Sequence, residues 1–190
     1  MKKVDQILKV AKDLFWKYGI KRVTIEEICK EAQVSKMTFY KYFSNKIELV
    51  KHIYGNLTEV GMNKYNAIMN SNIPFVDKVR KSIDLKMEQT EALSQEFYND
   101  LINSDDPEIK ELFNKTVQQN IQIILNDYLE AQRKNEIRND IKPEFILYFL
   151  NHMFEMANDK QLGSLYNTPN EMIMELTNFF FYGILPRDNE

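Results

Sequence analysis

The chain has 190 residues and a net charge of −3, and its five Gly and five Pro leave few turn formers, which favours long helices over sheets. The one cysteine, Cys29, excludes an internal disulfide framework, and no apolar segment is long enough to span a bilayer, so we expect a cytoplasmic protein. Residues 1–52 carry 12 Lys/Arg and 6 Asp/Glu, whereas residues 53–190 carry 13 and 22. A basic N-terminal quarter predicts contact with a polyanion, although chance clustering on a solvated surface is the alternative.

Apolar periodicity predicts the first helix over residues 4–18, and Gly19 supplies its end. The next start is Thr24, which has Glu27 three residues later in a capping-box spacing. We expect a short second helix over about residues 25–32.

Ser35 is the N-cap candidate of a third helix, in which Phe39 and Phe43 share the inward face. Asn45 then caps a long fourth helix over residues 46–70. Two short helices joined by a tight turn are typical of a helix-turn-helix.

The rest of the chain also reads as helices, and four prolines near predicted helix starts support this reading, because the first turn does not use their missing N–H. The predicted class is all-α with about nine helices. The later helices are expected over residues 75–92, 94–103, 107–134, 143–159 and 169–184, and the prolines are Pro74, Pro107, Pro143 and Pro169.

The run TIEEICKEAQVSKMTFYKYFSNKIELV resembles the signature of the TetR family of bacterial transcriptional regulators, and the resemblance covers roughly residues 4–60. The matching features are the Thr that opens the second helix, the A-x-V-S turn, the Y-x-Y-F end of the third helix and Lys46. The chain departs from the family at Gln33, where Gly is usual. A left-handed backbone at a non-Gly residue costs about 1 kcal/mol.

The resemblance implies a three-helix DNA-binding domain over residues 1–61, with the helix-turn-helix at about 24–43 and the third helix in the major groove. The side chains expected to read bases are Lys36, Met37, Thr38, Tyr40 and Lys41, and those expected to hold phosphates are Thr24, Ser35, Tyr42 and Lys46. Thr24 and Ser35 have the alternative of being plain helix caps, and the tyrosines that of being packing residues.

The resemblance further implies that residues 62–190 form a helical domain for ligand binding and dimerisation. The helices at 143–159 and 169–184 are apolar around most of their circumference, so they must be buried on all sides. We therefore expect a homodimer through these two helices, bound to a pseudo-palindromic operator as a repressor that a small-molecule effector releases. Central helices of a monomer are the alternative.

The effector site is the least defined expectation. Its candidate side chains, of a kind that more often forms plain core, are Met62, Tyr65, Met87, Phe97, Tyr98, Phe113 and Tyr128. The sequence indicates no metal, no cofactor and none of the common catalytic motifs. The remaining alternatives are an interaction module without DNA binding and an enzyme that uses only carboxylates.

Overall fold

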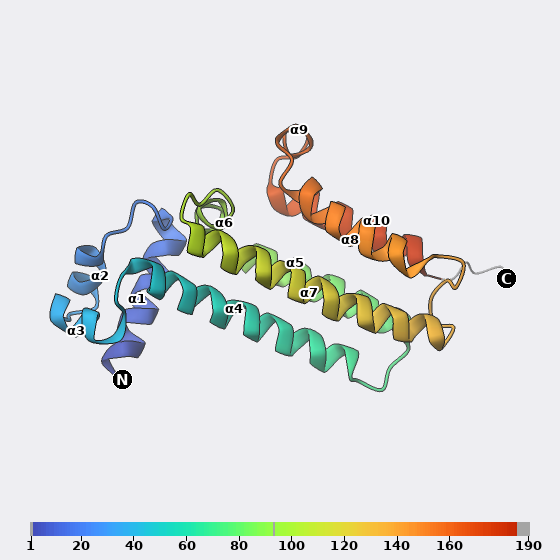
Figure 1. Cartoon of the computed structure of the whole chain (residues 1–190), viewed down its shortest axis with the longest axis horizontal. Helices are drawn as coiled ribbons and strands as arrows, with labels where there is room; N and C mark the ends of the chain where they lie inside the picture. The colour runs from blue at the N-terminus through green and yellow to red at the C-terminus, as the bar shows by residue number, and fades with distance from the viewer. Residues whose placement is uncertain (1, 93, 186–190) are drawn as a thin grey trace. The chain divides into compact units, whose positions relative to one another are not determined.

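The computed structural model describes residues 2–92 and 94–185, and the regular elements in this part of the chain are ten α-helices. The all-α class is confirmed. In chain order (Figure 1) the helices are α1 Lys3–Tyr18, α2 Ile25–Glu31, α3 Lys36–Tyr42, α4 Lys46–Met69, α5 Phe75–Ala92, α6 Gln95–Ile102, α7 Pro107–Arg133, α8 Pro143–Ala157, α9 Lys160–Gly163 and α10 Pro169–Ile184.

The predicted count was one helix short, because the short α9 was not predicted. Asp159 is its N-cap and accepts a hydrogen bond from the Leu162 N–H at 2.7 Å. The prediction had instead extended the preceding helix as far as Asp159. That helix ends at Ala157.

Packing divides the chain into two compact units, one built from residues 1–60 and 93–116 and the other from 61–92 and 117–190, as far as they are described. These units follow contacts. The functional division into residues 1–61 and 62–190 remains a prediction.

In the first unit, α1 packs against α2, α3 and α6. Phe15 of α1 and Phe39 of α3 are fully buried, and burial of such a side chain contributes about 1.5–3 kcal/mol. Phe97 of α6 extends the same core, because its ring lies 6.5 Å from that of Phe15 and 4.4 Å from that of Trp16. This core fixes the backbone from which the polar face of α3 projects.

The helix ends of the first unit follow the predicted signals. The side chains of Thr24, Ser35 and Asn45 accept hydrogen bonds from backbone N–H groups three residues later. At the end of α2, Gln33 has a φ of 51°, so the left-handed residue expected there is confirmed. The N–H of Val34 donates to the Cys29 carbonyl and that of Gln33 to Lys30, which together make a Schellman end.

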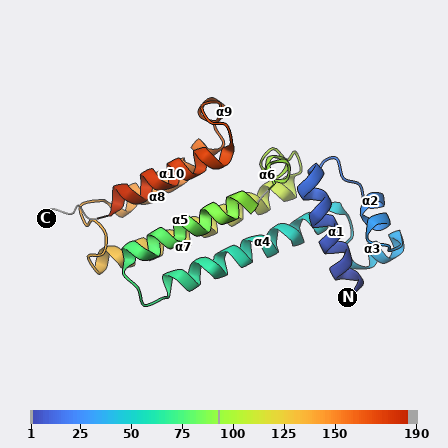
Figure 2. The same ribbon diagram turned by 180° about the vertical axis from the view of Figure 1, so that it is seen from behind.

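The second unit is built around an aromatic core in which α10 packs against α5 and α8. Tyr128 of α7 lies at its centre, with its ring 5.6 Å from Phe180 and 6.1 Å from Phe181. Figure 2 shows α8 and α10 running side by side. Across the described residues, no helix combines the length and apolarity needed to cross a membrane.

Candidate nucleic-acid interface

The two faces of α3 differ sharply in exposure. Phe39 is fully buried, whereas Met37 is 83% exposed and Tyr40, Lys41 and Tyr42 are also exposed. Phe39 holds Tyr40 in an edge-to-face contact with ring centroids 5.5 Å apart, so the Tyr40 ring has a defined position at the border of the core. The outer face therefore offers a thioether, phenols and an ammonium to a ligand.

At the start of α3, the hydroxyl of Ser35 serves as the helix cap. It accepts from the Thr38 N–H at 3.0 Å, and the two hydroxyl oxygens lie 2.9 Å apart. Ser35 is exposed and Thr38 is half-buried. The cap is uncharged, so it places no negative group in the path of a phosphate that approaches this end of α3.

Lys36 is not free at the edge of this face. Its ammonium forms an ion pair with the carboxylate of Glu26 on α2. This contact raises the pKa of Lys36 and lowers the pKa of Glu26. Glu26 was not among the predicted site residues, although an acidic side chain on the first helix of a helix-turn-helix and a basic one on the second were visible in the sequence.

Thr24 has the cap role that was its alternative interpretation. Its hydroxyl oxygen accepts from the Glu27 N–H at 3.2 Å, and the Glu27 carboxylate accepts in return from the Thr24 N–H at 2.8 Å and its hydroxyl at 3.1 Å. These hydrogen bonds from Thr24 lower the pKa of Glu27. A negative charge therefore lies at the start of α2.

Lys46 is half-buried, and its ammonium points back into the protein. It donates to the carbonyl oxygens of Ile20 and Val23, both at 2.8 Å, and approaches that of Lys21 at 3.5 Å. Burial lowers its pKa. Three acceptors match the three N–H donors of an ammonium, so Lys46 fastens the turn between α1 and α2 to the start of α4.

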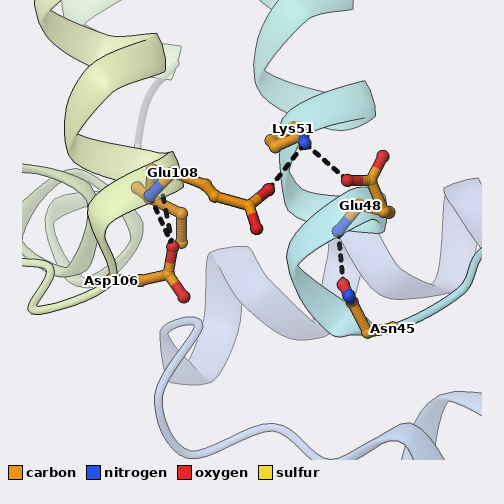
Figure 3. A network of polar contacts seen from close by, with 6 residues as sticks. Asn45, Glu48, Lys51, Asp106 and Glu108 are labelled. Atoms are coloured by element: carbon orange, nitrogen blue, oxygen red, sulfur yellow. Dashed lines mark hydrogen bonds and ion pairs between the residues drawn. The ribbon is translucent and has the colours of Figure 1, made fainter.

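The first turns of α4 are held by a polar network, which Figure 3 shows from close by. Asn45 accepts from the Glu48 N–H at 2.8 Å, and the Lys51 ammonium contacts Glu48 and, at 2.9 Å, Glu108 of α7. Glu48 and Glu108 raise the pKa of Lys51. The ammonium groups of Lys46 and Lys51, two basic residues near the helix-turn-helix, thus make contacts within the protein.

The predicted effector residues divide between the two units. Phe97, Tyr98 and Phe113 belong to the first unit, where Phe97 is part of the core and Phe113 packs on Tyr54 at 5.7 Å. The others belong to the second unit: Met87 is exposed, Tyr128 is buried in the aromatic core, and Met62 and Tyr65 are half-buried. In the described residues, no group of three or more His, Cys, Asp or Glu side chains is arranged to hold a metal ion.

α8 and α10 each bury one face and expose another. Ile146 and Phe180 are buried in the second core, whereas Phe179 is 73% exposed, Tyr182 is 66% exposed and Phe145 is also exposed. An open groove of about 470 Å³ lies between the two helices. An apolar surface that spans two helices is typical of an interaction site.

Comparison with known proteins agrees with this geometry. Residues 7–53 match the family model for bacterial regulatory proteins of the tetR family. The transcriptional regulator YhgD of Bacillus subtilis is 26% identical over 140 residues, which cover 72% of this chain and 71% of YhgD. A transcriptional regulator of Cytophaga hutchinsonii shares the fold with a TM-score of 0.76 at 18% identity, over 97% of this chain and 99% of its own. A TetR/AcrR-family regulator of Thermobifida fusca also shares the fold, with a TM-score of 0.69 at 18% identity, over 94% of this chain and 96% of its own.

The helix-turn-helix of α2 and α3, with its polar outer face, defines a DNA-binding transcriptional regulator. The match over the N-terminal helices specifies it further. Over residues 7–53 the chain matches the TetR family of bacterial regulators.

Proposed function

We propose that this regulator binds a pseudo-palindromic operator as a homodimer and represses transcription in the cytoplasm until a small-molecule effector releases it. The observation that carries the proposal is the outer face of α3, where Met37, Tyr40 and Lys41 are exposed over a helix fixed by Phe39. A helix with such a face fits the major groove, where an ammonium donates to guanine and an apolar group contacts the thymine methyl.

The exposed residues of α3 divide into two roles in this proposal. Lys41 and Thr38 donate to base edges, while Met37 and the Tyr40 ring contact methyl groups. Ser35 and Tyr42 hold phosphates and set the register without reading sequence. Lys36 joins the base readers once it leaves Glu26. Thr24 and Lys46 support the binding surface mainly from within, through the contacts described above.

The proposed dimer pairs the exposed apolar faces of α8 and α10 between two copies of the chain. Such isologous pairing buries Phe145, Phe179 and Tyr182 on both subunits. A two-fold dimer presents its two α3 helices to successive major grooves, which is why the operator is expected to be pseudo-palindromic.

The effector contacts among the second unit's residues remain proposals. Met62 and Tyr65 of α4 and Tyr128 of α7 combine apolar surface with hydroxyl groups, as ligand sites in helical proteins commonly do. Phe97, by contrast, is chiefly a core residue, since its ring packs against those of Phe15 and Trp16.

Selection of bound sequences from random duplex DNA tests the proposal directly. We expect a two-fold symmetric consensus, and affinity for it that falls steeply with salt because bound cationic side chains release counterions from the phosphates. A ligand screen for release from the selected sequence then tests the effector. Absence of any enriched sequence, or affinity indifferent to ionic strength, would rule out the proposed mode of binding.

A further inference from the structure

The end of α1 brings two cations to one aromatic ring. The Arg22 guanidinium carbon lies 4.2 Å from the centroid of the Tyr18 ring, and the Lys17 ammonium lies 4.9 Å from it. Tyr18 is 37% exposed, and Lys17 and Arg22 are both exposed. Lys17 first and Arg22 second lower the pKa of the Tyr18 hydroxyl, as expected for cations that sit beside the phenol. We call these three residues the Tyr18 cation cluster.

Two like charges repel, and the ring only partly offsets this, so an anion beside both cations would relieve the repulsion. Within the described residues, neither Lys17 nor Arg22 forms an ion pair with a carboxylate. Four basic side chains of the same unit are, in contrast, engaged with the protein itself: Lys21 with Asn103, Lys36 with Glu26, Lys46 with Ile20 and Val23, and Lys51 with Glu48 and Glu108.

The cluster lies close to the start of α2. Arg22 precedes the cap residue Thr24 by two positions. The hydrogen bonds from Thr24 lower the pKa of Glu27 most, and the positive charge of Arg22 lowers it further. A phosphate that approaches this end of α2 meets the Glu27 carboxylate, because Glu27 already accepts from both the N–H and the hydroxyl of Thr24. A positive group beside the cap is therefore needed to make the approach favourable.

We infer that the Tyr18 cation cluster holds a backbone phosphate of the bound duplex at the α2 end of the helix-turn-helix. Arg22 makes the contact, Lys17 adds positive charge, and Tyr18 is a positioning residue that keeps the guanidinium stacked in place. This inference rests on the proposed DNA-binding function. It assigns to Arg22 the contact at this end of α2 that the sequence had assigned to Thr24.

The test is the salt dependence of duplex binding by the full-length protein, measured by fluorescence anisotropy on the selected operator and on a random duplex. Arg22→Ala is expected to weaken binding about tenfold on both, and to reduce the slope of log K against log salt by about 1, the loss of one phosphate contact. Lys110→Ala removes an exposed positive charge from α7 of the same unit and is the matched control, with an unchanged slope.

The role of Tyr18 is separated from a purely structural one by a double-mutant cycle. Tyr18→Phe keeps the ring and should bind like the wild type, whereas Tyr18→Leu should lose part of the affinity. In the Arg22→Ala background, Tyr18→Leu should cost nothing more, since its effect operates through Arg22.

An unchanged slope in Arg22→Ala, with the wild type binding normally, overturns the inference and leaves the proposed function standing. Additive losses in the cycle overturn the role of Tyr18. Failure of the wild type to bind any duplex removes the proposed function, and the inference falls with it.

Discussion

The ammonium of Lys46 lies against the carbonyl oxygens of Ile20 and Val23, which precede it by 26 and 23 positions. Family resemblance predicted a phosphate contact for this lysine. A sequence motif identifies which side chain is present, but it does not reveal acceptors that the fold brings near from distant positions. The same holds for Lys36, whose partner Glu26 is ten residues away on another helix. A motif therefore predicts a set of candidate site residues, but not the partner that the fold gives to each of them.

Removal of the Lys46 ammonium should affect the fold as well as DNA binding. Lys46→Ala leaves two backbone carbonyls without their partner, and we expect a loss of about 1–2 kcal/mol of unfolding free energy. Urea unfolding followed by the fluorescence of Trp16, the one tryptophan in the chain, measures this loss in the first unit. A variant with weakened DNA binding and wild-type stability would instead support the direct phosphate contact.

Glu26 competes with DNA for Lys36. Glu26→Gln removes the ion pair and one negative charge beside α3, so tighter duplex binding and a steeper salt dependence are expected. Titration of one labelled duplex at several salt concentrations provides the measurement. Glu31→Gln, an equal change of charge at the exposed end of α2, is the control. Weaker binding by Glu26→Gln would mean that Glu26 places Lys36 for contact and does not withhold it.

Helices and their ends were the most predictable elements, because their signals are local. The Thr24 capping box, the Ser35 cap and the Gly19 stop each lie within a few residues of the helix end they define. The four-residue α9 escaped prediction because it is too short to show an apolar period. The effector residues were inferred from aromatic and methionine composition, which does not distinguish a pocket from a core, and Phe97 proved to be core.

The left-handed backbone of Gln33 at the end of α2 leads to a prediction about stability. Its φ of 51° suits glycine, so Gln33→Gly should relieve about 1 kcal/mol of backbone strain. The extra freedom of glycine in the unfolded chain offsets about 0.5–1 kcal/mol of this, so the expected net gain in stability is at most about 0.5 kcal/mol. Asn135 ends α7 in the same way with a φ of 58°, and because Asn tolerates this conformation, Asn135→Gly should gain less. Urea unfolding followed by circular dichroism compares the two. Equal gains would show that relief of backbone strain is not the cause.

At the scale of the whole molecule, the exposed faces of α8 and α10 predict the oligomeric state. Charges at Phe179 and Tyr182, introduced together as Phe179→Glu and Tyr182→Glu, should give a monomer with normal helix content. Loss of the second half-site contact should weaken operator binding on the order of a hundredfold. Sedimentation equilibrium measures the mass, with Val60→Glu, at an exposed apolar residue of α4, as the control. A dimeric double variant would place the interface elsewhere.

One face of α10 fills the core of its own chain and the other is turned outward. In the proposed dimer, this division makes the stability of the protein depend on its concentration. Phe180 and Phe181 are buried in the core of the single chain, whereas the exposed Phe179 and Tyr182 would become buried only in the proposed dimer. By mass action, unfolding of such a dimer should become harder as the protein becomes more abundant. At low concentration the protein would then be both less dimeric and more exposed to proteolysis. The concentration of intact dimer would therefore rise more steeply than the rate at which the protein is synthesised.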